Sequence, residues 1–191
     1  MVKNFLGTLI LVVGNSGSGK DSIINGASEE YPLDLKKVYI VKRYITRPPS
    51  ENEDNYFIST EEFNEMSKQG KFALQWHIYG LNYGVPIEIE KWLKKGHPVI
   101  VNVSRIIIND TRKKYENVKV VFIEVPFDIT LQRLKNRERE SEEGLKERIE
   151  RARNNQKFPE ADFVVDNSGE LDEAISQFLN YVINIVKDNK Q

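Results

Sequence analysis

The sequence predicts an α/β fold in which helices flank a five-stranded parallel sheet. Five apolar runs are rich in Val and Ile and do not alternate cleanly with polar residues, a pattern typical of parallel strands buried on both faces. Helix-like stretches separate most of these runs, and such alternation favours one parallel sheet with right-handed crossovers. The chain has 191 residues, 39% of them hydrophobic and 30% charged, which is enough for one domain with a buried core.

The elements of this predicted fold follow one another along most of the chain. The predicted strands are residues 8–14, 37–43, 98–104, 118–125 and 161–167. The predicted helices are residues 20–30, 106–115, 126–137 and 171–186. The last of them carries apolar residues at helical spacing.

The first apolar run, FLGTLILVV at residues 5–13, could be mistaken for an export signal. It runs directly into a glycine-rich stretch, and no small-residue cleavage site follows it. It is also too short to span a membrane as a helix. We therefore expect a buried strand, a cytoplasmic protein and no membrane partner.

The alternation of strands and helices is interrupted in two places. Residues 45–90 hold two aromatic-rich strand-like segments and a helix-like one, which predicts a small inserted substrate-binding subdomain. The rest, residues 1–44 and 91–191, then forms the core of a single domain. Residues 137–156 are charged on all sides; they form either a solvated helix or an arginine-rich lid over phosphate groups.

The composition excludes several classes of site. A net charge of −1 gives no basic field, so no nucleic-acid partner is expected. The chain has no cysteine and only two histidines, His77 and His97, which excludes disulfides and disfavours a structural zinc site. The expected partners are therefore small molecules, and the oligomeric state stays open, with a homodimer among the options.

The stretch GNSGSGKDS at residues 14–22 contains a motif that binds phosphate groups. Its first seven residues match the pattern G-x-x-x-x-G-K, placed between a predicted strand and a predicted helix. Its glycines allow unusual backbone conformations, its amides and the helix start form an anion site, and its lysine adds a positive charge. The sequence thus predicts ATP binding by Gly14, Asn15, Ser16, Gly17, Ser18, Gly19, Lys20, Asp21 and Ser22.

The residue after the lysine departs from the usual motif. The pattern asks for Ser or Thr, whose hydroxyl binds Mg²⁺, whereas this chain has Asp21 there and Ser22 one place later. A carboxylate is a good oxygen ligand for Mg²⁺. Asp21 is therefore the candidate metal ligand, and Ser22 a candidate phosphate contact or loop cap.

Candidate acceptor-binding residues follow the second predicted strand. Arg43 lies at its carboxyl end, Arg47 follows four residues later, and two prolines stiffen the segment beyond Arg47. Because open α/β sheets bind ligands at the carboxyl ends of their strands, two guanidinium groups here suit a phosphate-bearing substrate. Arg105 directly follows the third predicted strand, and the stretch FALQWHIYGLNYG adds Gln75, His77 and Tyr83 as further candidates.

These segments together resemble the guanylate-kinase-like branch of the P-loop kinases. The resemblance covers nearly the whole chain through GNSGSGK, ITRP, DNYFIS, FALQW, NYG and RLKNRERESEEGLKERIERA. It implies the P-loop NTPase fold, with ATP and Mg²⁺ as cofactors. It also implies that Arg47 and Tyr83 hold the acceptor phosphate, that Arg137 and Arg148 act from the lid beside Lys20 in catalysis, and that Arg133 lies near the adenine.

Several positions depart from the guanylate kinase pattern. Asn55 replaces a tyrosine, Gln75 the glutamate that reads guanine, Asn102 an acidic residue and Val85 a small hydroxyl residue. Since a guanine edge needs acceptors for its N–H groups, the loss of these carboxylates disfavours GMP. Asn55, Gln75 and Asn102 remain candidate substrate contacts.

A closer resemblance is to the ribose 1,5-bisphosphate phosphokinases within this branch. It rests on GKDS, ITRP, WH, YGV, SR and NRERE, and it includes Asp after the loop lysine, although that family often has Pro where this chain has Asn15. It implies transfer of the ATP γ-phosphoryl group to the 1-phosphate of ribose 1,5-bisphosphate. Two alternatives remain: a nucleoside monophosphate kinase with altered base recognition, and a binding module without catalysis.

Overall fold

The computed structural model describes residues 2–48, 54–136 and 142–188. The chain forms two compact units. The first comprises Met1–Leu11, Pro32–Lys119 and Ile185–Gln191, and the second comprises Val12–Tyr31 and Val120–Asn184. The predicted insert, residues 45–90, lies wholly within the first unit, and its boundaries remain a prediction.

The predicted α/β fold with a five-stranded parallel sheet is confirmed. The strand order is β2-β7-β1-β8-β9, and the pairs β2–β7 and β8–β9 are parallel. The strands are β1 (Leu9–Gly14), β2 (Tyr39–Ile40), β7 (Val99–Asn102), β8 (Val118–Glu124) and β9 (Phe163–Asp166). All five predicted apolar runs form strands, and the side chains of Leu9 to Val13 are completely buried, as the apolar character of that run requires.

The strand β2 is shorter than its sequence suggests. The apolar character of residues 37–43 predicts seven strand residues, but only Tyr39 and Ile40 pair with β7. This strand lies at one end of the strand order, so it has a neighbour on one side only. Val41 still donates its N–H to the carbonyl of Ile100, at 3.0 Å, and the chain then leaves this sheet for the next one.

A second, smaller sheet occupies part of the predicted insert. Its order is β4-β3-β6-β5, with β5 and β6 forming an antiparallel hairpin. Its strands are β3 (Tyr44–Ile45), β4 (Tyr56–Phe57), β5 (Phe72–Ile78) and β6 (Leu81–Pro86). The hairpin turns at Tyr79 and Gly80, whose φ angles of 54° and 69° match the primed turn that suits strand twist. Leu81 and Asn82, which follow this turn, already pair with Ile78 and His77 in the hairpin.

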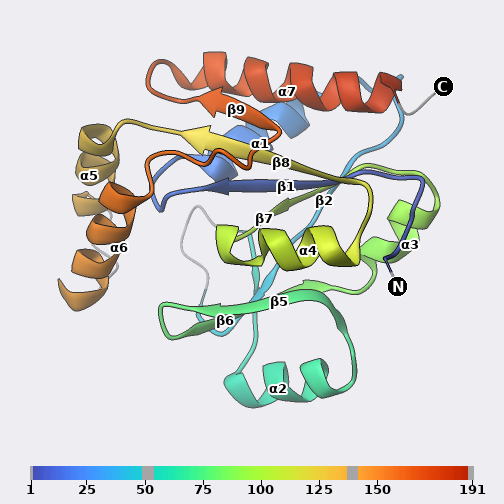
Figure 1. Ribbon diagram of the computed structural model, residues 1–191, viewed down its shortest axis with the longest axis horizontal. Coiled ribbons are helices and arrows are strands. Elements are labelled where there is room, and N and C mark those ends of the chain that lie inside the picture. Colours follow the sequence, from blue (N-terminus) through green and yellow to red (C-terminus); the bar gives the residue numbers. More distant parts are fainter. Residues whose placement is uncertain (1, 49–53, 137–141, 189–191) are drawn as a thin grey trace. The chain divides into compact units, whose positions relative to one another are not determined.

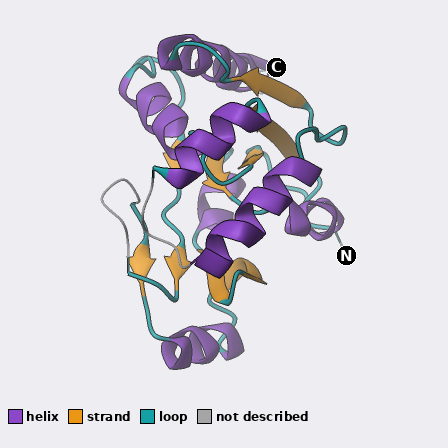
Figure 2. Cartoon of the chain, turned by 90° about the vertical axis from the view of Figure 1, so that its left-hand side faces the viewer, coloured by secondary structure: helices purple, strands orange, loops and turns teal. Residues whose placement is uncertain are grey.

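The helix of the predicted insert lies against this small sheet. The helix α2 (Thr60–Lys68) begins with a capping box in which Ser59 and Glu62 satisfy each other's backbone N–H groups. Its Phe63 stacks on Phe72 of β5 with ring centroids 4.7 Å apart. Figure 1 labels α2 below β5 and β6, and Figure 2 shows the same helix below the strands of the small sheet.

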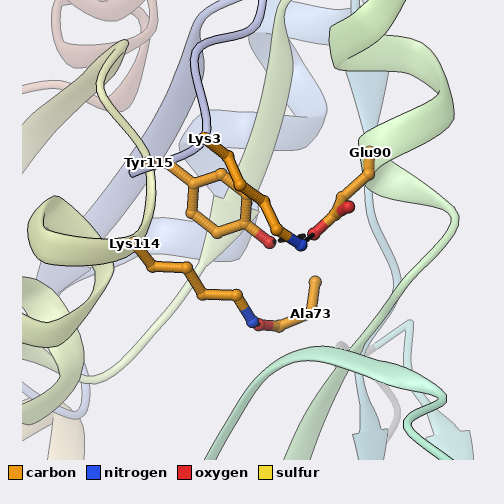
Figure 3. Close-up of polar contacts among 5 residues, drawn as sticks. All are labelled: Lys3, Ala73, Glu90, Lys114 and Tyr115. Carbon is orange, nitrogen blue, oxygen red and sulfur yellow. Dashed lines mark hydrogen bonds and ion pairs between the residues drawn. The ribbon is translucent and has the colours of Figure 1, made fainter. Parts of the chain in front are cut away.

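The remaining helices of the first unit are α3 (Ile89–Lys94) and α4 (Ile108–Lys114). The predicted helix at 106–115 begins as the 3₁₀ turn η1 (Arg105–Ile107) before it becomes α-helical. Figure 3 shows a polar network that joins α3, the residue after α4 and the N-terminal segment. The carboxylate of Glu90 accepts hydrogen bonds from the ammonium of Lys3 at 2.6 Å and from the hydroxyl of Tyr115 at 2.7 Å.

The second unit contains the helices α1 (Lys20–Glu29), α5 (Phe127–Lys135) and α6 (Glu142–Asn154), and most of α7 (Leu171–Asp188). The helix α7 covers β9 in Figure 1. Its Tyr181 stacks on Phe163 of β9, with ring centroids 4.3 Å apart. The charged stretch 137–156 contains α6, whose Ala152 is buried. Among the described residues, no helix is both long and apolar enough to cross a membrane.

Candidate active site

The glycine-rich loop follows β1 and leads into α1, as the sequence predicts. Gly17 and Gly19 have φ angles of 86° and 83°, which residues with a side chain rarely adopt. A Cβ atom on Gly14 would lie 2.6 Å from Oγ of Ser18 and 2.9 Å from the carbonyl oxygen of Ile123. The glycines are therefore needed for the shape of the loop, and not only for its flexibility.

The ammonium group of Lys20 lies inside the curve of this loop. It donates hydrogen bonds to the carbonyl oxygens of Gly14 and Asn15, each at 2.9 Å, and to Oγ of Ser18 at 3.4 Å. These bonds close the loop around one positive charge. A phosphate group bound here would meet that charge together with the positive end of the α1 dipole.

Two of the predicted arginines lie beside the loop. Arg148 of α6 donates a hydrogen bond from Nη1 to Oγ of Ser16, at 2.8 Å. Arg133 of α5 also lies close to the loop. Its Cβ is 3.6 Å from the position that a Cβ atom on Gly17 would occupy, and its Nη1 is 3.9 Å from the position that a Cβ atom on Gly19 would occupy. The structure thus brings the loop, Arg133 and Arg148 together, while Arg137 lies outside the described residues.

Asp21 lies in the first turn of α1 and is half-buried, whereas Ser22 is exposed. Within the described residues no cluster of three or more acidic or histidine side chains could hold a metal ion. A single carboxylate nevertheless fits Mg²⁺ at a nucleotide site, because this ion keeps several waters and binds phosphate oxygens as well as one or two carboxylates. Asp21 can therefore serve as the one protein ligand.

Asn167 has no role among the sequence-based predictions, but the structure places it against the loop. This residue follows β9 and is 2% exposed. Its side-chain nitrogen donates to the carbonyl oxygen of Ser18 at 2.8 Å and lies 2.6 Å from where a Cβ on Gly19 would be. A polar residue that ends a buried strand of a parallel sheet is the sequence signal for such a role.

Three acceptor-side candidates lie on one face of the small sheet. Arg43 donates from Nε to Oδ1 of Asn55 at 3.2 Å, because these residues directly precede the parallel strands β3 and β4. The guanidinium carbon of Arg43 lies 5.9 Å from the centre of the Tyr83 ring. Tyr83 is buried and stacks on Trp76 of β5 with ring centroids 5.1 Å apart.

Gln75 and His77 lie on the opposite face of the hairpin. They alternate with Trp76, which pairs with Tyr83, so their side chains point away from the Tyr83 face. The side-chain oxygen of Gln75 accepts a hydrogen bond from Ser67 of α2 at 2.8 Å. Nδ1 of His77 lies 2.8 Å from Oδ1 of Asn82, within hydrogen-bonding distance.

The hairpin positions on the same face as Tyr83 are apolar. Leu74 pairs with Val85, and Trp76 pairs with Tyr83; all four side chains are buried. None of Leu74, Trp76 and Val85 has a carboxylate or carboxamide that could accept N–H groups of a purine base. This face offers Arg43 and the Tyr83 hydroxyl for an anion. The carboxamide of Asn55 on this face comes from the segment before β4, not from the hairpin, and its oxygen accepts the hydrogen bond from Arg43.

The other acceptor-side candidates come from different segments of the first unit. Arg47 is half-buried and donates from Nη1 to the carbonyl oxygen of Pro48 at 3.4 Å. Asn102 is buried at the carboxyl end of β7, and the half-buried Arg105 begins η1 three residues later. Both therefore lie at the edge of the sheet where ligands bind in open α/β folds.

Comparison with known proteins agrees with these features. The guanylate kinase family profile matches residues 7–184. A ribose 1,5-bisphosphate phosphokinase PhnN from Pseudomonas paraeruginosa is 37% identical over 180 residues, which cover 92% of this chain and 95% of that protein. Its counterpart from Bradyrhizobium diazoefficiens is 37% identical over 178 residues, which cover 93% and 89%.

A solved structure supports the fold. The crystal structure of a guanylate kinase from Anaplasma phagocytophilum matches 97% of this chain and 89% of its own, with a TM-score of 0.67 and 19% sequence identity. Similarity at this level of identity supports the architecture, and the curated relatives define the branch. The chain therefore belongs to the guanylate kinase family, and within it to the branch of the ribose 1,5-bisphosphate phosphokinases.

Proposed function

We propose that this protein transfers the γ-phosphoryl group of ATP to the 1-phosphate of ribose 1,5-bisphosphate. The products are ADP and 5-phospho-α-D-ribose 1-diphosphate. The observation that carries the proposal is the Tyr83 face of the hairpin, which combines Arg43 and Tyr83 with the apolar Leu74, Trp76 and Val85. A phosphorylated sugar without a base suits this face, and the names of the curated relatives agree.

The donor side is the glycine-rich loop with Lys20, Arg133 and Arg148. The loop amides and Lys20 bind the β- and γ-phosphates of ATP, and Arg133 lies on the adenine side. Lys20 can follow the phosphoryl group as it moves, because its ammonium is a flexible point charge. Arg148, with Arg137 as a second candidate from the same charged stretch, stabilises the charge that spreads over the transferring group.

The acceptor side binds two phosphate groups and the ribose. Arg47 and Tyr83 hold the 1-phosphate that is to be phosphorylated. Arg43 and Arg105 are candidates for the 5-phosphate, and Asn55 and Asn102 for the ribose hydroxyls. Gln75 and His77, on the other face of the hairpin, are weaker candidates than the sequence suggests.

The transfer itself needs positioning and charge neutralisation more than proton chemistry. The acceptor atom is an ionised phosphate oxygen, so no general base has to remove a proton. One O–P bond forms at the 1-phosphate and the bond to the β-phosphate breaks, which leaves ADP. Asp21 would be the protein ligand of Mg²⁺, and the ion would supply further positive charge to neutralise the phosphates.

The small-molecule partners are thus ATP and a sugar bisphosphate. An enzyme that consumes ATP is expected in the cytoplasm, where ATP is made and kept. No nucleic-acid partner is expected, since the net charge is −1. A homodimer remains one possible assembly, and the proposed reaction does not depend on it.

An acceptor panel tests the proposal. Purified enzyme with MgATP is offered ribose 1,5-bisphosphate, ribose 5-phosphate, GMP or AMP, and ADP release is followed in each case. Lys20→Met is the matched control for contaminating kinases. We expect turnover with the bisphosphate only; faster turnover with GMP or AMP overturns the proposal in favour of a nucleoside monophosphate kinase, and ATP binding without any turnover in favour of a binding module.

A further inference from the structure

Asn15 of the glycine-rich loop contacts the carboxyl-terminal end of α6. Its side-chain nitrogen donates to the carbonyl oxygen of Asn155 at 3.0 Å and, more weakly, to that of Ala152 at 3.4 Å. More than 130 residues separate these partners in the sequence. The contact therefore joins the loop to a helix that the chain reaches only much later.

The end of α6 needs such donors. The last four carbonyl groups of an α-helix have no partner within the helix, so they must be satisfied by side chains, water or neighbouring segments. Two of the local amides serve this purpose: Asn155 donates to the carbonyl oxygen of Arg151 at 2.8 Å, and Gln156 donates to that of Arg153 at 3.1 Å. Asn15 supplies a third amide, and it comes from the loop.

The neighbouring loop residue binds the same helix through a different group. Ser16 accepts the hydrogen bond from Arg148, which lies one turn before Ala152 on α6. Asn15 and Ser16 thus contact two points on one face of the helix, namely its carboxyl-terminal end and Arg148. Arg153 adds a contact to α5, where its guanidinium lies 5.2 Å from the ring of Phe127.

We propose that Asn15 is a positioning residue that caps α6 from the glycine-rich loop and thereby holds Arg148 over the phosphate site. The cap fixes the distance between the last turn of α6 and the loop. Arg148 is then in place before ATP arrives, so the transferring phosphoryl group meets an ordered guanidinium. The catalytic consequence rests on the proposed function, whereas the cap itself does not.

Hydrogen exchange of the ligand-free, full-length protein tests the cap directly. Asn15→Ala is compared with the wild-type chain and with Gln156→Ala, which removes a cap amide from the same helix end without touching the loop. We expect Asn15→Ala to raise amide exchange in peptides of both α6 and the loop, and Gln156→Ala to affect only the end of α6. Unchanged exchange in the loop and α6 of Asn15→Ala overturns the proposal.

A double-mutant cycle tests the link to Arg148. Asn15→Ala is expected to lower kcat about tenfold, as the loss of one or two neutral hydrogen bonds allows. In the Arg148→Ala background the same change should cost less than about twofold, because the residue being positioned is gone. Gln156→Ala should leave kcat unchanged in both backgrounds.

Hydrogen exchange and the double-mutant cycle together distinguish a failure of the Asn15 proposal from a failure of the proposed function. Equal losses from Asn15→Ala in both backgrounds mean that Asn15 acts on ATP directly or only on folding, and they overturn its positioning role. If no acceptor is turned over at all, the proposed function fails, and only the hydrogen-exchange result bears on the cap. Hydrogen exchange in the loop and α6 tests whether Asn15 caps α6, whatever the kinetic measurements show.

Discussion

The side-chain nitrogen of Asn167 donates a hydrogen bond to the carbonyl oxygen of Ser18, over 2.8 Å. In a trans peptide the C=O and N–H groups point in opposite directions. By holding the Ser18 carbonyl, Asn167 therefore turns the N–H of Gly19 away from itself. Gly19 precedes α1 and has a left-handed backbone that permits this orientation.

Replacement of Asn167 should weaken ATP binding. Asn167→Ala removes the donor, so we expect the KM for ATP to rise about tenfold with a smaller effect on kcat. Asn167→Asp should be worse, since a carboxylate there repels both the carbonyl and a bound phosphate. Steady-state kinetics with varied ATP check this, and an unchanged KM in both variants contradicts the role.

Arg148 should matter for the chemical step more than for binding. Because the proposed role of its guanidinium is to stabilise charge that develops during transfer, Arg148→Ala should lower kcat by about 10²–10³-fold. Arg148→Lys should recover only part of this loss, because an ammonium lacks the planar fork of donors. A kcat within about twofold of the wild type in the alanine variant would show that this arginine does not contact the transferring group.

Tyr83 offers a sharper test of the acceptor side. Its ring is packed against Trp76, so Tyr83→Phe removes the hydroxyl and keeps the packing. We expect the KM for the sugar bisphosphate to rise about fivefold to tenfold while the KM for ATP stays the same, since the proposed hydrogen bond to the acceptor phosphate is lost. Equal changes in both constants would indicate a general loss of structure.

The network in Figure 3 should make stability depend on pH. Burial alone would raise the pKa of Glu90, but the hydrogen bonds from Lys3 and Tyr115 and the nearby charge of Lys114 outweigh it and lower the pKa below its usual value. A lowered pKa means that the ionised carboxylate stabilises the folded state. This contribution is complete above the pKa that the group has in the unfolded chain, and it is lost as the pH falls through the folded-state pKa.

Glu90→Gln is therefore expected to cost about 1–3 kcal/mol of unfolding free energy at neutral pH, with a smaller difference from the wild type in acid. The exposed Glu116, which follows Tyr115 in the chain, provides the control variant Glu116→Gln. Urea unfolding at several pH values measures both. A Glu90→Gln difference that stays constant in acid contradicts the assignment.

Much of the fold could be predicted because its signals are local. The five apolar runs and the loop GNSGSGK depend only on nearby residues, and the structure forms β1, β7, β8 and β9 close to the expected bounds. The length of β2 could not be predicted, since it depends on its position at one end of the strand order.

The candidate site was less predictable where it depends on register or on distant contacts. The sequence grouped Gln75 with Tyr83, but the hairpin register places these side chains on opposite faces. In the sequence, Asn15 stands out only because it departs from the family pattern. Asn167 stands out only because it ends a predicted strand. Their partners on α6 and in the loop lie far away in the sequence, where no local pattern reveals them.

Phosphorus NMR of the enzyme with MgATP and ribose 1,5-bisphosphate tests the central claim most directly, with GMP in a separate sample. The proposed function predicts a new pair of diphosphate signals from 5-phospho-α-D-ribose 1-diphosphate beside those of ADP, and no reaction with GMP. Formation of GDP, with the sugar bisphosphate left unchanged, would contradict it and would mean that a base is read by residues outside the Tyr83 face of the hairpin.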